Sequence, residues 1–180
     1  HEGEDIKGKT IACAGFGNVT WGICKKAHHL GAKVVTLSGP DGYIYDPEGV
    51  SSSMEKVDYL LTMRASGRNK VKDYADKFGV EFFPGEKPWG VKADVIMPSA
   101  MQNDVHMEHA KQIVANGVKY YIEVANMPTT NDALFYLMEQ PNMIVAPSKA
   151  VNAGGVAVSA LEMSQNSMRF SWSFEEVDQR

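Results

Sequence analysis

The sequence has little of what marks several large protein classes. It has two cysteines in 180 residues, Cys13 and Cys24, too few for the disulfide framework of a small secreted protein. We expect Cys13 in a buried strand and Cys24 in a helix, both as small apolar fillers in a reducing compartment. It also has no apolar run of about 20 residues, the length needed to cross a bilayer. We therefore predict a cytoplasmic protein with no membrane partner.

Basic charge is not in excess either. The 18 Lys and Arg stand against 22 Asp and Glu, giving a formal net charge of -4 at pH 7. No long basic run and no interleaving of basic with aromatic residues is present. Nucleic-acid binding surfaces need such a concentration of positive charge, so we expect no nucleic-acid partner.

Conventional catalytic and metal-binding groups are scarce. His106 and His109 have the spacing of two ligands on one helix face, but no third ligand accompanies them, so we expect an exposed face and no metal. Lys149 is the one lysine that we expect in a loop near the ligand-binding edge of the sheet, where it could take part in the chemistry. We predict no catalytic residue in this chain, with the chemistry completed by another domain. The chain opens on His1 rather than Met, and we expect it to be a piece of a longer protein.

A pair of glycines after an apolar strand is the most informative motif. Gly15 permits a tight turn, and Gly17 lets the backbone approach a phosphate without a side chain in the way. The following helix would turn its free N–H groups and positive end toward the anion. Thr20 stands at the third position, where glycine or alanine is usual, and Gly22 could ease the packing there. This order of strand, turn and helix predicts a dinucleotide site.

Strand and helix patterns alternate along the rest of the chain. Gly31 ends the first helix, and further strands are expected at 33–38, 80–83, 94–97, 120–124 and 143–145. Helices are expected from Ser53 to Met63 and at 71–78, 104–116, 131–139 and 152–165, whereas 38–42 is a turn. Residues 167–174 are left unassigned. The pattern predicts one α/β domain over 1–180 with a doubly wound, mostly parallel sheet, a Rossmann-like NAD(P)-binding domain.

Ligands of such sheets lie beyond the carboxyl ends of the strands. The loops there, 98–103, 125–130 and 146–155, are rich in small polar residues, and Gln102, Asn126 and Asn152 offer amides to ribose hydroxyls and a carboxamide. In a single loop, such residues could simply form a turn or cap a helix, as they do in proteins of any function. Three on the same rim as the glycine turn favour a nicotinamide dinucleotide.

Five longer motifs carry a family resemblance. Residues 15–19, 38–47, 102–104, 123–130 and 148–156 resemble the nucleotide-binding domain of bacterial hexameric glutamate dehydrogenases. The leucine, valine and phenylalanine dehydrogenases fit less well. The resemblance implies oxidative deamination of L-glutamate to 2-oxoglutarate and ammonia, with hydride passing from the substrate Cα to the nicotinamide. It also implies a homo-hexamer for the full-length protein, and a catalytic lysine and aspartate in an N-terminal domain outside this chain.

The motif, the rim loops and the resemblance together name the site residues we expect. The resemblance implies that Val156 and Ser159, at the start of a helix, bind the distal carboxylate of glutamate. The cofactor residues share the turn and the rim, with Asn126 near the nicotinamide ribose and amide. They are Gly15, Phe16, Gly17, Asn18, Val19, Ser38, Pro40, Asp41, Ala100, Gln102, Asn126 and Asn152.

The sequence favours NAD as the cofactor and leaves NADP open. The end of the second strand lacks the acidic residue that usually holds the ribose 2′-hydroxyl, and the first acid is Asp41 in the turn. Asp41 would repel a 2′-phosphate, whereas Arg64 falls where NADP-dependent relatives place a basic residue. The alternatives are an NADP-dependent glutamate dehydrogenase, another amino-acid dehydrogenase, or a dinucleotide-sensing module without turnover. A sensing module would not need the segment 152–159 to bind a second ligand, so this segment favours an enzyme over a sensing module.

Overall fold

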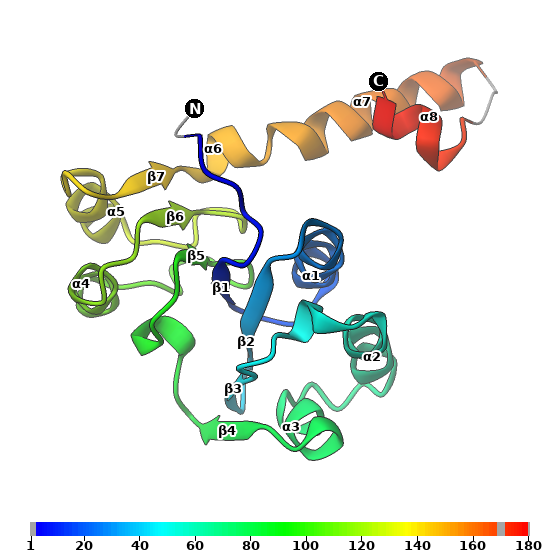
Figure 1. Ribbon diagram of the computed structural model, residues 1–180. Helices are drawn as coiled ribbons and strands as arrows, with labels where there is room; N and C mark the ends of the chain where they lie inside the picture. The colour runs from blue at the N-terminus through cyan, green and yellow to red at the C-terminus, as the bar shows by residue number, and fades with distance from the viewer. Residues whose placement is uncertain (1–2, 169–171, 180) are drawn as a thin grey trace.

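The structure, a computed structural model, describes residues 3–168 and 172–179. Within these residues seven strands form one sheet in the order β4-β3-β2-β1-β5-β6-β7 (Figure 1). Among these strands only β3 runs in the opposite direction, antiparallel to β2 and β4, so the predicted mostly parallel α/β sheet is confirmed. The strands are β1 (Thr10–Cys13), β2 (Lys33–Gly39), β3 (Gly42–Tyr45), β4 (Glu81–Pro84), β5 (Val95–Met97), β6 (Tyr120–Ile122) and β7 (Ile144–Ala146).

Most helices begin and end near the residues that the sequence predicts, but the predicted loop 146–155, which includes Lys149, contains a short helix at Ser148–Val151. Gly31 ends the first helix at φ 76°, a conformation that glycine adopts without strain. The Ser53 hydroxyl accepts a hydrogen bond from the Lys56 N–H at the start of α2. The helices are α1 (Asn18–Leu30), α2 (Met54–Ala65), α3 (Lys72–Phe78), α4 (Met107–Ala115), α5 (Asn131–Met138), α6 (Ser148–Val151), α7 (Ala153–Met168) and α8 (Phe174–Gln179). None of the described helices is long and apolar enough to cross a membrane.

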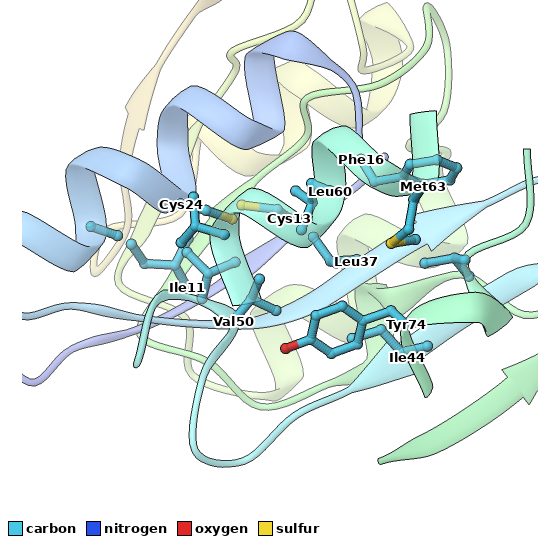
Figure 2. Packing of buried hydrophobic residues seen from close by; sticks show 14 of the residues in the cluster. Ile11, Cys13, Phe16, Cys24, Leu37, Ile44, Val50, Leu60, Met63 and Tyr74 are labelled. Carbon is cyan, nitrogen blue, oxygen red and sulfur yellow. The ribbon is translucent and has the colours of Figure 1, made fainter. Parts of the chain in front are cut away.

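Side chains of β1 point alternately to the two faces of the sheet. Ile11 and Cys13 join a buried cluster with residues of α1, α2 and α3, and Figure 2 shows this packing. Ala12 and Ala14 join a second cluster with residues of α4 and α5. Both faces are therefore covered by helices, as the continuous apolar strand patterns predict.

The strand order reverses direction at β1. From β1 the chain adds β2, β3 and β4 on one side, and then returns to place β5, β6 and β7 on the other. A crevice forms where two such halves separate, beyond the carboxyl ends of the central strands. The loops after β1 and β5 meet at this point.

Two features differ from the expectations. Strand β3, whose Tyr43 and Ile44 are buried, was not predicted, and the turn at 40–41 joins it to β2 as a hairpin. Helix α7 extends away from the sheet (Figure 1), and its side chains are mostly exposed. Of the unassigned residues 167–174, the first two end α7 and the last begins α8, whereas 169–171 lie outside the described residues.

Candidate functional site

A cleft of about 690 Å³ opens at the carboxyl ends of β1, β2 and β5, where the strand order reverses. This volume lies within the usual range for cofactor pockets, roughly 300–1,000 Å³. The cleft is formed by the glycine turn, the β2–β3 hairpin, the end of α2, the loop after β4 and the loop after β5. Its lining residues are Gly15, Phe16, Gly17, Ser38, Gly39, Pro40, Gly42, Arg64, Asn69, Gly85, Glu86, Lys87, Ala100, Met101, Gln102, Asn103 and Asp104.

Gly15 makes the tight turn that the sequence predicts. Its φ is 77°, and a Cβ added there would lie 3.1 Å from the Cβ of Ala100 on the neighbouring loop. The Gly15 N–H donates to the Ser38 hydroxyl at the end of β2, at 2.9 Å. The turn is therefore held on both sides, and only glycine combines this conformation with this close approach.

Gly17 leaves the first turn of α1 open. It is the N-cap of this helix, no side chain caps the helix there, and the first turn carries no acidic residue. A Cβ added at Gly17 would meet no atom of the described residues within 4 Å, apart from its own chain neighbours. Unpaired N–H groups at a helix start, with no side chain in front of them, suit an anionic group such as a phosphate.

Thr20 fits the third position of the motif by turning its hydroxyl back to the chain. It is fully buried, and its Oγ1 donates to the Ala14 carbonyl oxygen at 2.9 Å. The Ser99 hydroxyl donates to the same oxygen at 2.7 Å. These two hydroxyls join β1, α1 and the loop after β5. Gly22 does not ease the packing as expected, because open space surrounds the position of its Cβ.

The Asp41 carboxylate is bound to the start of α3. Its two oxygens accept from the Val71 and Lys72 N–H groups at 2.9 and 3.0 Å. Asp41 itself does not line the cleft, although Pro40 and Gly42 beside it do. The carboxylate thus brings a negative charge to this end of the cleft from a fixed position, rather than reaching into it.

Arg64 reaches the cleft from the last turn of α2. Its Nη1 donates to the Asn18 Oδ1 at 2.5 Å, across from α2 to the first residue of α1. The guanidinium is exposed and lines the cleft, whereas Asn18 does not. Asn18 is therefore connected to the cleft by its hydrogen bond with Arg64.

An ion pair joins the two loops that line the cleft after β4 and β5. Lys87 lies 2.8 Å from the Asp104 carboxylate and donates to the Asp104 carbonyl oxygen at 3.0 Å. The Asn103 N–H in turn donates to the Met127 carbonyl oxygen, and both residues have positive φ, 54° and 48°. Such conformations are uncommon outside glycine and often lie at functional sites. The loops after β5 and β6 are thus locked together.

The structure brings together some of the predicted cofactor residues and leaves others apart. Gly15, Phe16, Gly17, Ser38, Pro40, Ala100 and Gln102 line the cleft. Asn18, Val19 and Asp41 lie in the adjoining helix start and hairpin, and Asn126 and Asn152 follow β6 and β7 on the same edge of the sheet. The structure thus brings seven of the twelve to the cleft, and for all twelve the cofactor role stays a prediction.

The predicted substrate residues lie on α7. Val156 is 70% exposed and Ser159 is also exposed, and their spacing of three residues puts them on one helix face. Ser159 lies six residues after Ala153, where α7 begins. The helix does begin directly after Asn152, as predicted, with Val156 in its first turn and Ser159 in its second. The favourable field of a helix start fades within the first turn, so Ser159 gains little from it.

Burial shifts the pKa of two cysteines and one histidine. Burial raises the pKa of the Cys13 thiol well above its usual value, and it raises that of Cys24 to about 12. Both cysteines are fully buried, which confirms them as apolar fillers in a strand and a helix. Burial, with the nearby Lys87, lowers the pKa of His109, whose ring accepts from the His106 N–H at 3.0 Å. These two histidines thus cap the N-terminus of α4.

Glu123 is a buried acidic residue that the sequence reasoning missed. It follows β6, is 2% exposed, and accepts from the Ser148 N–H with Oε2 at 2.9 Å. Its other oxygen, Oε1, has no partner among the described residues. The available signal was a single glutamate within the apolar run 120–124.

Comparison with known proteins decides the family. The model of the Glutamate/Leucine/Phenylalanine/Valine dehydrogenase family matches residues 1–180. The chain belongs to this family. It is 73% identical over 180 residues to the NAD-specific glutamate dehydrogenase of Clostridium symbiosum, covering 100% of this chain and 40% of that relative. It is 45% identical over 177 residues to the NADP-specific glutamate dehydrogenase of Haemophilus influenzae, covering 98% and 39%.

A solved glutamate dehydrogenase agrees with this family assignment. It superposes with a TM-score of 0.97 at 73% identity, over 99% of this chain and 40% of that structure. Both the resemblance and the fold class are confirmed. This member of the Glutamate/Leucine/Phenylalanine/Valine dehydrogenase family spans about 40% of the length of the relatives it matches.

Proposed function

We propose that this chain is the NAD-binding part of a glutamate dehydrogenase, an oxidoreductase that converts L-glutamate to 2-oxoglutarate and ammonia. The observation that carries the proposal is the uncapped start of α1 at Gly17, facing a cleft at the reversal of strand order. A dinucleotide fits here, because the pyrophosphate needs free N–H groups without a Cβ in front of them.

The residues of the chain would divide the cofactor between them. The backbone from Gly15 to Val19 would hold the pyrophosphate, and Ser38 and Pro40 would lie beside the adenosine half. Asn126 and Asn152, beyond β6 and β7, would hold the nicotinamide half, since each half of such a sheet binds one mononucleotide. When bound, the nicotinamide supplies the acceptor for the hydride that leaves the substrate Cα.

The substrate would meet α7. We assign the distal carboxylate of glutamate to Ser159, whose exposed hydroxyl can donate a charge-assisted hydrogen bond, and to Val156 one turn before it. No acid or base for the reaction is assigned to this chain. We expect the catalytic lysine and aspartate in the rest of the full-length protein, which we propose to be a cytoplasmic homo-hexamer.

NAD is the proposed cofactor rather than NADP. The support is the Asp41 carboxylate, fixed beside Pro40 at the adenosine end of the cleft, together with 73% identity to an NAD-specific relative against 45% to an NADP-specific one. A negative charge there disfavours a 2′-phosphate by repulsion.

Steady-state assays of the full-length protein test the proposal. Glutamate-dependent formation of NADH, with kcat/KM higher for NAD than for NADP, is the expected result. Leucine, valine and phenylalanine should be poor substrates. Binding of NAD without turnover of any of these amino acids would favour a dinucleotide-sensing module instead, and turnover of another amino acid would favour a different dehydrogenase.

A further inference from the structure

Glu123 occupies a position that stability alone does not explain. A carboxylate that is 2% exposed has lost nearly all its hydration, and only Oε2 has a partner among the described residues. A buried polar atom left without a hydrogen bond costs free energy. Residues that break a local rule without a compensating gain often serve the site.

The backbone on both sides of Glu123 is held firmly. Its N–H donates to the Ala146 carbonyl oxygen on the neighbouring strand at 2.9 Å. The next two N–H groups, of Val124 and Ala125, donate to the Pro98 carbonyl oxygen at 3.1 and 2.9 Å. Glu123 therefore projects from a fixed point between the loops that follow β5 and β7.

From this point Glu123 reaches the segment that leads to α7. Its Oε2 accepts from the N–H of Ser148, the first residue of α6. The Ser148 carbonyl oxygen accepts from the Asn152 N–H at 2.9 Å, and Ala153 begins α7. Two hydrogen bonds thus connect the end of β6 to Asn152.

We infer that Glu123 is a positioning residue, which holds the Ser148 amide and thereby places Asn152 for the nicotinamide carboxamide of a bound dinucleotide. The inference rests on the proposed function. The contact that carries it is the hydrogen bond from the Ser148 N–H to Glu123 Oε2, so Glu123 acts through Ser148 and Asn152. The glycine turn lies across β5 from this segment and is held by different bonds, from Ser38, Thr20 and Ser99.

The test compares two ligands of the full-length protein by titration calorimetry. ADP-ribose carries the adenosine, the pyrophosphate and a ribose but no nicotinamide, so it reports on the glycine turn. NAD reports on both halves. In Glu123→Met, which keeps the length of the side chain but removes the acceptor, the ratio of NAD affinity to ADP-ribose affinity should fall by about fivefold to tenfold.

Three further variants separate positioning from folding. Ser148→Pro removes the donor of the same hydrogen bond at a helix position that tolerates proline, and should lower the ratio similarly. Glu123→Gln keeps an oxygen acceptor and should restore most of the ratio. Asp46→Asn is the matched control, since Asp46 is a carboxylate 1% exposed that binds Lys56 and Tyr74. It should lower thermal stability and leave the ratio unchanged.

An unchanged ratio in Glu123→Met or in Ser148→Pro would overturn the inference, and so would an equal loss in Asp46→Asn. If Glu123→Met does not fold, Ser148→Pro alone decides. Both ligands are measured without turnover. A protein that binds them but does not oxidise glutamate would contradict the proposed function while still showing whether Glu123 positions Asn152.

Discussion

Alanine at Gly15 and at Gly17 should harm the protein in two different ways. At Gly15 the φ of 77° disfavours any side chain, and the new Cβ would lie 3.1 Å from the Cβ of Ala100, which has no flexible end to move aside. An L-residue in this conformation costs about 1–2 kcal/mol. We expect Gly15→Ala to lower the free energy of unfolding by about this amount, which at this chain length moves Tm by about 2–8 °C.

Gly17→Ala should leave stability nearly unchanged. The φ of -78° suits alanine, and among the described residues nothing but the adjoining chain lies within 4 Å of the new Cβ. Loss of glycine flexibility in the unfolded chain stabilises by about 0.4–1 kcal/mol, and the poorer N-cap offsets most of that. The methyl group would instead stand in front of the open N–H groups of α1. Losing a charge-assisted hydrogen bond to a phosphate weakens NAD binding by about tenfold to a hundredfold.

Thermal unfolding followed by circular dichroism, and calorimetric titration with NAD, measure the two effects on the 180-residue chain. A Gly17→Ala chain that binds NAD as tightly as the unmutated chain would refute the placement of the phosphates. A Gly15→Ala chain of unchanged Tm would refute the strained turn.

Three other outcomes follow from the same site. The 180-residue chain alone should bind NAD but form no NADH from glutamate, and measurable glutamate-dependent NADH formation would show that an acid and a base are present in it. Asp41→Asn removes the charge but keeps an acceptor for α3, so the ratio of NAD to NADP affinity should fall about tenfold; if calorimetry shows NADP as the tighter ligand before mutation, Arg64 dominates. In the full-length protein, Ser159→Ala should lower kcat/KM for glutamate by about tenfold to a hundredfold with unchanged NAD affinity. An unchanged kcat/KM would mean that the hydroxyl only serves its own helix.

The sheet could be predicted largely because its strands are buried on both faces. Continuous apolar runs such as β2 are visible in the sequence, and Gly31 and Ser53 mark helix ends by their backbone and hydrogen-bonding preferences. β3 was missed because it is four residues long and follows a turn directly. Its strand character comes from pairing with β2 and β4, a long-range contact that no local pattern reports.

The part of the site that depends on backbone conformation could be predicted from the sequence. The part that depends on contacts between side chains and distant segments could not. The glycine turn lies where the motif places it. The pattern could not show that the Asp41 carboxylate binds the start of α3, because Val71 and Lys72 are about 30 residues away along the chain. Glu123 was missed for the same reason, since its partner Ser148 belongs to another loop.

The position of the pyrophosphate tests the central claim most directly. A crystal structure of the full-length protein with NAD should show phosphate oxygens within hydrogen-bond distance of the backbone N–H groups at the start of α1, from Gly17 to Val19, with the adenosine toward Pro40. A dinucleotide whose phosphates lie away from this helix start, or a cleft that stays empty at saturating NAD, would contradict it.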